Sequence, residues 1–239
     1  EIRPVNAVVN AFHYLNLVQM SEIAQALGKT EDATFFRERA EMVKTSFNRV
    51  FTDGKTQLYI DGEGAQHSSA HANIAALAFG LVPEERVGAV ADFIERKGMV
   101  CSVYFAQYLL EALFKADRAD AAIRLMTAVG DRSWLGMMES GSTITMEAWS
   151  LAAKPNQDWN HAWATAPLNI IARYVLGVTP VEPGFTKVVF FRVRNTGDIA
   201  FDYKLAGGAL MDLGVYSIHF VVGIFGMPKS VNYFPNIEK

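Results

Sequence analysis

The sequence has little of what would indicate a disulfide framework, a membrane span or a nucleic-acid surface. Cys101 is the only cysteine in 239 residues, so no intrachain disulfide can form, and it is most simply a small buried residue. No run of basic residues occurs, and the formal net charge is -3. The most apolar stretch, residues 213–227, contains His219 and is shorter than the roughly 18 residues of a membrane helix. We therefore expect a soluble protein that binds neither nucleic acid nor membrane.

Signatures of metal ions, cofactors and targeting are also missing. No Cys/His spacing resembles a zinc site, and no Gly-x-Gly-x-x-Gly opens a βαβ unit, so we expect neither a metal ion nor a dinucleotide. His67 and His71 are four residues apart on a predicted helix, but no third ligand is indicated, and a polar helix face is favoured. No signal peptide opens the chain, which begins as though cut from a longer polypeptide, and the compartment is not indicated.

Helical periodicity dominates the first half of the chain. It predicts helices at about 5–27, 30–51, 66–80, 84–97, 103–116 and 118–129. A short turn joins the two helices of each successive pair, so we expect stacked antiparallel hairpins, in either a solenoid or a closed α/α ring. The periodicity is lost over 130–157, which predicts a long irregular connection of the kind that often carries function. A helix at 159–176 and strands at 188–193 and 229–233 are predicted to follow.

One carboxylate lies in an unusual setting within and after this connection. Glu147 lies in Gly141-Ser-Thr-Ile-Thr-Met-Glu-Ala-Trp149, which is followed by Asp158-Trp-Asn-His-Ala-Trp163. Indole faces stack on the apolar faces of sugars, and amide, hydroxyl and imidazole groups bond sugar hydroxyls. The carboxylate could then act on a water or on a glycosidic oxygen. The pattern favours a sugar-binding catalytic pocket, and the alternative is an exposed glutamate beside a core tryptophan cluster. Tyr104 and Tyr108 could reach the same cleft or pack in the core.

Together with the hairpins, this motif resembles glycoside hydrolase family 78, the α-L-rhamnosidases. The matching pieces are Met20–Gly28, Tyr108–Leu113, Ser133-Trp134, Gly141–Trp149, Asn160-His161, Leu176–Pro180 and Pro183-Gly-Phe185. The resemblance covers about residues 1–190 and implies a mainly α fold, the second half of a six-hairpin (α/α)6 toroid. It also implies inverting hydrolysis of terminal α-L-rhamnosides without a cofactor, with a rhamnose-containing carbohydrate as the binding partner.

The resemblance assigns roles to individual residues. Glu147 corresponds to the general base that activates water, and the expected sugar-binding residues are His161, Asn160, Trp149 and Trp134. The family's general acid lies in a loop of the earlier half of the ring, which has no counterpart in this sequence. We therefore expect weak or no activity unless that N-terminal half is supplied. Glu139 could substitute as the acid, but a solvated loop residue is favoured.

The last part of the chain departs from this plan. Gly207–Tyr216 and Phe225–Val231 resemble the Gfo/Idh/MocA oxidoreductases, in which the residues at Asp212 and Tyr216 flank the substrate. Because the dinucleotide-binding motif of that family is missing, the resemblance implies a remnant motif in a short α/β fragment. The predicted domains are 1–190 and 191–239. Two alternatives to an incomplete glycosidase stay open: a mis-joined product of two genes that folds without activity, and a non-catalytic helical module that binds carbohydrate.

Overall fold

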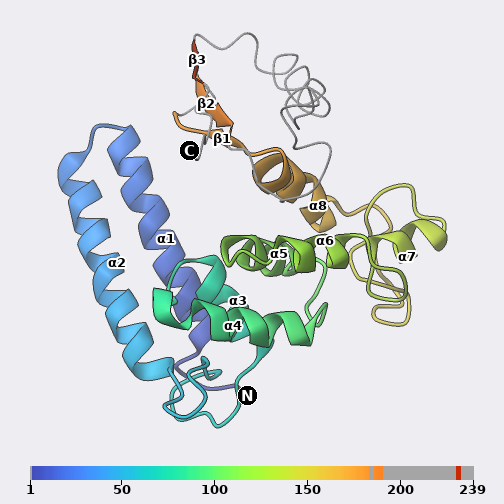
Figure 1. Ribbon diagram of the computed structural model, residues 1–239, viewed down its shortest axis with the longest axis horizontal. Coiled ribbons are helices and arrows are strands. Elements are labelled where there is room, and N and C mark those ends of the chain that lie inside the picture. The colour runs from blue at the N-terminus through green and yellow to red at the C-terminus, as the bar shows by residue number, and fades with distance from the viewer. Residues whose placement is uncertain (1, 183–185, 191–229, 233–239) are drawn as a thin grey trace, which may run out of the picture. The chain divides into compact units, whose positions relative to one another are not determined.

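The computed structural model describes residues 2–182, 186–190 and 230–232 (Figure 1). They fall in two compact units, Glu1–Ala166 and Pro167–Lys239. The helices and strands are α1 (Ala7–Ala26), α2 (Thr30–Phe51), α3 (Ala70–Ala78), α4 (Glu84–Lys97), α5 (Ala106–Lys115), α6 (Ala119–Met126), α7 (Trp134–Glu139), η1 (Ala162–Ala164), α8 (Ala166–Ile170), η2 (Ile171–Val175), β1 (Val178–Pro180), β2 (Lys187–Phe190) and β3 (Ser230–Asn232). The mainly helical fold predicted from the sequence is confirmed.

The first six helices form three hairpins. α1 packs along α2 in the longest of them, and α3 packs on α4 and α5 on α6 (Figure 1). α3 also contacts both α1 and α5, the other two odd-numbered helices. The odd helices therefore form one layer, and each is followed in the chain by a helix that packs on it. This alternation is how successive hairpins build an α/α toroid or solenoid.

The first hairpin shows why these residues form helices. The side chain of Asn6 caps α1 by accepting a hydrogen bond from the N–H of Val9 at 3.1 Å. The chain leaves α1 at Gly28, whose φ of 71° is a left-handed conformation that glycine adopts without strain. The hydroxyl of Ser21 donates to the carbonyl of Ala33 at 2.7 Å, which joins the two helices near this turn. Each helix buries a stripe, formed by Ala7, Ala11, Tyr14, Leu17 and Ala24 in α1 and by Ala33, Ala40, Phe47 and Phe51 in α2.

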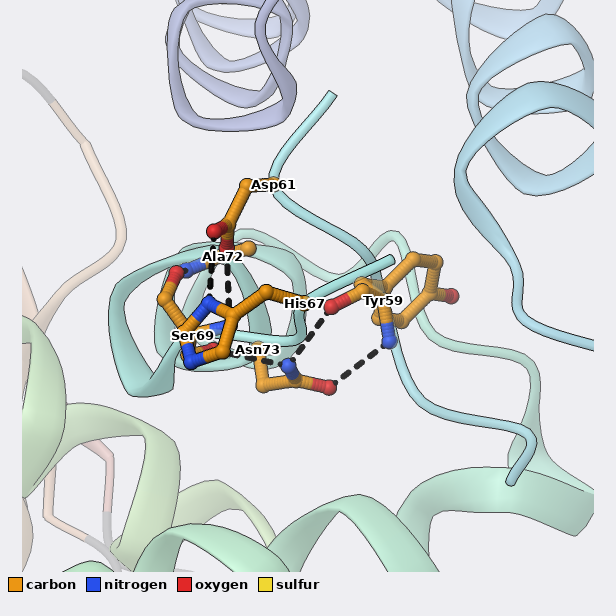
Figure 2. A network of polar contacts seen from close by, with 6 residues as sticks. All are labelled: Tyr59, Asp61, His67, Ser69, Ala72 and Asn73. Carbon is orange, nitrogen blue, oxygen red and sulfur yellow. Dashed lines mark hydrogen bonds and ion pairs between the residues drawn. The ribbon is translucent and has the colours of Figure 1, made fainter. Parts of the chain in front are cut away.

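A buried amide fixes the segment before α3 (Figure 2). Asn73 is fully buried, and its side chain pairs with both backbone groups of Tyr59. It accepts from the Tyr59 N–H and donates to the Tyr59 carbonyl, each at 2.9 Å. Asp61 accepts from the Ser69 N–H at 2.8 Å and lies 2.7 Å from Nδ1 of His67. Residues 59–69 are thereby held against the start of α3.

Because of these contacts, α3 begins at a later residue than the sequence predicts. The predicted helix at 66–80 begins only at Ala70, because Ser69 is the N-cap and its hydroxyl accepts from the Ala72 N–H at 3.2 Å. His67 therefore lies outside the helix. The prediction that His67 and His71 share a helix face is wrong.

Tyr59 also joins α2 to α4. Its hydroxyl donates to Oδ1 of Asn48 at 2.6 Å and accepts from the guanidinium of Arg86 at 2.9 Å. Arg86, which is buried, also donates to Asn48 and, at 2.9 Å, to the hydroxyl of Thr52. Burial raises the pKa of Tyr59 to about 12, so its hydroxyl stays protonated and can keep donating. One tyrosine thus connects three helices through its backbone and its ring.

The second unit contains a three-stranded sheet in the order β1-β2-β3. β1 pairs antiparallel with β2, with Val178 opposite Phe190, and β2 pairs parallel with β3, with Lys187 opposite Ser230. β2 and β3 overlap the predicted strands at 188–193 and 229–233, whereas β1 was not predicted. The two units divide after Ala166, before the predicted boundary at 190, so that domain boundary stays a prediction. Asp212 and Tyr216 lie outside the described residues.

None of the helices in the described ranges combines the length and the apolar character that crossing a bilayer requires.

Replacing Asn73 with alanine should destabilise the first unit strongly. The change leaves the N–H and the carbonyl of Tyr59 buried without their partner, at roughly 1–3 kcal/mol for each group. We expect the free energy of unfolding in urea to fall by about 2–4 kcal/mol. Glu38→Ala, on the exposed face of α2, is the control and should change it by less than about 0.5 kcal/mol. Equal losses in the two variants would contradict this account.

Asp61 should make stability depend on pH. Burial alone would raise the pKa of Asp61, but hydrogen bonds from Ser69 and His67 hold it well below its usual range. A carboxyl whose pKa is lower in the folded state stabilises the fold above its unfolded pKa of about 4 and loses this contribution below it. Asp61→Asn should therefore lower the melting temperature at pH 7, and the difference from the parent should narrow as the pH falls below about 4. A difference that does not change between pH 7 and pH 3 would show that the charge is unimportant.

Candidate active site

The two segments that the sequence analysis singled out lie side by side. The N–H of Glu147 donates to the carbonyl of Asp158 at 3.0 Å, and the N–H of His161 donates to the carbonyl of Thr145 at 2.8 Å. The hydroxyl of Thr145 returns a bond to the carbonyl of His161 at 2.7 Å. These pairings hold residues 145–147 against 158–161 as two antiparallel arms. They also explain why the predicted helix at 159–176 is wrong at its start, because helical geometry begins only at Ala162.

Glu147 is held by two donors. Lys154 forms an ion pair with Oε1, and the N–H of Asp158 donates to Oε2 at 3.1 Å. The ammonium of Lys154, and then the Asp158 N–H, hold the pKa of Glu147 below its usual value. The side chain remains 18% exposed, so the ionised carboxylate still reaches solvent. An ionised carboxylate suits a general base, whereas a general acid requires a raised pKa.

Two of the predicted sugar-binding residues are held in place through their indole N–H groups. Trp149 is only 5% exposed, and its Nε1 donates to the carbonyl of Cys101 at 2.8 Å. Nε1 of Trp134 donates to the carbonyl of Ala164 at 2.7 Å. The two indoles meet edge to face, with their ring centroids 5.0 Å apart. The two indoles support the loop in this position. Their contact with sugar stays a prediction, and the burial of Trp149 disfavours it.

His161 and Asn160 take more open positions. Asn160 is exposed on the same arm as His161. Nδ1 of His161 lies 3.7 Å from a carboxylate oxygen of Asp158, and its ring centroid is 4.1 Å from that of Trp163. The structure therefore places Glu147, His161 and Asn160 on one pair of arms. Their contacts with substrate stay predictions.

Sequence reasoning missed one residue and one contact at this site. Lys154 is the only charged residue between Glu147 and Asp158, and that isolation is the signal that could have indicated a partner for Glu147. The contact between Trp163 and Tyr104 was also missed. Their ring centroids are 5.6 Å apart although 59 positions separate them in the chain, and no sequence pattern indicates that contact.

The remaining candidates from the sequence are Glu139, the possible metal ligands and Cys101. Glu139 lines a cavity of about 370 Å³ together with Asp131 and Trp149, whereas Glu147 is not among its lining residues. Within residues 2–182, 186–190 and 230–232, no group of three or more His, Cys, Asp or Glu side chains could hold a metal ion. Cys101 is buried, and burial raises the pKa of its thiol to about 12, which makes it unreactive.

Comparison with known proteins identifies the family. Residues 2–175 match the bacterial alpha-L-rhamnosidase 6 hairpin glycosidase domain. The chain belongs to this family. An α-L-rhamnosidase of Formosa agariphila is 29% identical over 168 residues, which cover 64% of this chain and 17% of that relative.

Solved structures of family members share the fold. The family 78 rhamnosidase of Bacillus sp. GL1 superposes with a TM-score of 0.65 at 24% identity, over 77% of this chain and 20% of its own. An α-L-rhamnosidase of Streptomyces avermitilis, solved in complex with L-rhamnose, gives a TM-score of 0.60 at 22% identity, over 78% and 18%. The chain thus spans about a fifth of the length of these relatives.

Lys154 should control the titration of Glu147. Lys154→Met keeps the aliphatic length of the side chain and removes the ammonium, so the pKa of Glu147 should rise toward its ordinary value. A carbon-13 NMR titration of the Glu147 carboxyl measures this directly and requires no enzymatic activity. Lys29→Met, at an exposed position before α2, is the matched control and should leave the Glu147 pKa unchanged. An unchanged pKa in Lys154→Met would contradict the ion pair.

Proposed function

We propose that residues 2–175 contribute the water-activating part of an α-L-rhamnosidase site, with Glu147 as the general base for inverting hydrolysis of terminal α-L-rhamnosides. The observation that carries the proposal is the ionised Glu147 carboxylate, held by Lys154 and the Asp158 N–H next to His161 in a member of this family. The L-rhamnose complex of the Streptomyces relative supports a rhamnose-type sugar as the ligand.

The geometry of Glu147 suits this role. An ionised carboxylate has about four acceptor positions, and Lys154 and Asp158 occupy one on each oxygen. The remaining positions can accept a proton from a water molecule while that water attacks the anomeric carbon. In inverting enzymes a second carboxyl group, about 6.5–9.5 Å from the base, protonates the leaving oxygen. His161 and Asn160 are proposed to bond the sugar hydroxyls.

The general acid is proposed to come from the earlier half of the six-hairpin ring. Glu139 is a weaker candidate because it is exposed and lines a cavity, beside Asp131, whose lining does not include Glu147. Residues 2–175 then act together with that half of the ring, and hydrolysis depends on both.

Hydrolysis of 4-nitrophenyl α-L-rhamnoside tests the role of Glu147. The chain alone should turn over slowly or not at all, and mixing it with the first half of the ring from a related α-L-rhamnosidase should raise the rate. Glu147→Gln should reduce this turnover at least about 100-fold, because one of the two proton transfers is lost. The control variant, Glu139→Gln, should leave it unchanged. Proton NMR should show β-L-rhamnose as the first product, as inversion requires. Full turnover by Glu147→Gln would exclude the proposed base.

A non-catalytic carbohydrate-binding module is the second candidate. The exposed rings of Tyr104 and Trp163 favour it, because aromatic faces bind sugars without any proton transfer. Rhamnose binding that persists without hydrolysis, even when the first half of the ring is supplied, would favour this alternative.

For residues of about 198–231 we propose a remnant of an oxidoreductase motif around Asp212 and Tyr216. It has no part in the hydrolysis proposed for Glu147, because it lies outside the segment that matches the rhamnosidase family.

A further inference from the structure

The two arms that carry Glu147 and His161 depart from regular strand pairing at Glu147 itself. In an antiparallel pair, two hydrogen-bonded residues that face each other exchange two backbone hydrogen bonds. The Glu147 N–H follows this rule and donates to the carbonyl of Asp158 at 3.0 Å. The Asp158 N–H instead donates to Oε2 of the Glu147 side chain at 3.1 Å. A backbone donor of one arm is thereby directed at the proposed base on the other.

The next backbone donor after Glu147 is also bound by a side chain. The Ala148 N–H donates to Oε1 of Gln157 at 2.8 Å. Gln157 directly precedes Asp158 in the chain, so the two contacts are reciprocal. Each side of the pair gives one backbone N–H and one side-chain oxygen to the other side. Gln157 is therefore the counterpart of Glu147 on the opposite side.

Gln157 is buried although the loop that carries it is open. Within residues 148–158, only Trp149 and Gln157 are buried, at 5% and 6% exposure. Burial of an indole is expected, whereas burial of an amide requires hydrogen bonds. Among the described residues, Nε2 of Gln157 has no hydrogen-bond partner, which destabilises the fold. The benefit of an amide at this position therefore lies in its oxygen, the acceptor for Ala148.

The same loop brings Lys154 back to Glu147. The Gln157 N–H donates to the carbonyl of Lys154 at 3.2 Å, and the Lys154 N–H donates to the carbonyl of Ser150 at 3.2 Å. These two turns fold residues 150–157 so that the Lys154 ammonium reaches Oε1 of Glu147. Both donors that hold the Glu147 carboxylate are therefore connected to Gln157. Asp158 is its neighbour in the chain, and Lys154 is joined to it by a backbone hydrogen bond.

We propose that Gln157 is a positioning residue for Glu147. By accepting from the Ala148 N–H, its amide oxygen holds the two arms at the spacing in which the Asp158 N–H reaches the Glu147 carboxylate. Without this oxygen the Ala148 N–H loses its acceptor, and the arms relax toward regular pairing, in which the Asp158 N–H turns to the backbone carbonyl of Glu147. The proposal rests on the proposed function, because it concerns the base of that site. Gln157 acts only through the direction of the Glu147 carboxylate and takes no part in proton transfer.

Proton–nitrogen NMR of the full chain tests the proposal without enzymatic activity. An amide proton bonded to a carboxylate shifts as that carboxylate titrates, so the Asp158 amide should respond to Glu147. Because the Asp158 carboxyl also titrates, the response to Glu147 is the part of the shift that disappears in Glu147→Gln. Gln157→Met and Gln157→Asn should remove most of this response, since methionine has no acceptor oxygen and asparagine is one methylene shorter. Gln157→Glu keeps an oxygen at the same reach and should preserve it. Gln25→Met, at an exposed position on α1, is the matched control and should change nothing.

Kinetics with the first half of the ring supplied give a second measurement. Gln157→Met should lower kcat for 4-nitrophenyl α-L-rhamnoside about tenfold or more, because a base that is no longer aligned transfers its proton less efficiently. KM should change by less than about twofold, since the residues proposed to bond the sugar are not altered. A raised KM at unchanged kcat would assign Gln157 to sugar binding and overturn the positioning role.

The outcomes separate this proposal from the proposed function. An Asp158 amide that does not respond to Glu147 in the parent, or that responds equally in Gln157→Met and Gln157→Asn, would overturn the positioning role, whatever the hydrolysis assay shows. A response that is lost in these two variants and kept in Gln157→Glu, combined with hydrolysis that does not depend on Glu147, would support the positioning role and reject the proposed base. Loss of the response only in variants that also lose their thermal unfolding transition would assign Gln157 to the stability of the fold and overturn the proposal.

Discussion

Two indole N–H groups determine where the candidate site lies. A buried indole N–H needs an acceptor, and the acceptors here are backbone carbonyls from distant parts of the chain. Trp149 uses the carbonyl of Cys101, in the turn before α5, and Trp134 uses the carbonyl of Ala164. Since the two rings also pack on each other, the long connection between α6 and α8 is held against the start of α5. The arms carrying Glu147 and His161 extend from this support.

The hairpin layers give that support a fixed base. Tyr59 is bonded to Asn73 through its backbone and to Arg86 through its hydroxyl, so α2, α3 and α4 keep one arrangement. α5 packs on α3 and carries Tyr108 into contact with Phe79, at the end of α3. Buried hydrogen bonds and edge-to-face packing in the layers thereby determine the position of the Tyr108 ring.

Local sequence signals predicted the helices well where short-range interactions determine the helix ends. The helices predicted at 30–51 and 84–97 match α2 and α4, because both have acids in the first turn and α4 ends at Gly98 with a φ of 63°. The predictions were wrong where the backbone forms hydrogen bonds with residues far away in the sequence. Residues 159–161 pair with the Glu147 arm, and the start of α3 is delayed by the Asp61 contacts. The Glu147 motif could be recognised from the sequence, whereas the Tyr104–Trp163 contact depends on a fold that brings distant turns together.

Lys154 affects the suitability of Glu147 as a base in two opposing ways. An ammonium beside a carboxylate lowers its pKa and therefore its strength as a base, although a general base is most effective when its pKa lies near the working pH. The same contact keeps the carboxylate ionised when the solution becomes acidic, and it fixes the direction in which the free lone pairs point. An inverting base needs both properties, because water must attack from one defined side of the sugar. For the base proposed at Glu147, this geometry favours a fixed acceptor that stays ionised to lower pH over the strongest possible base.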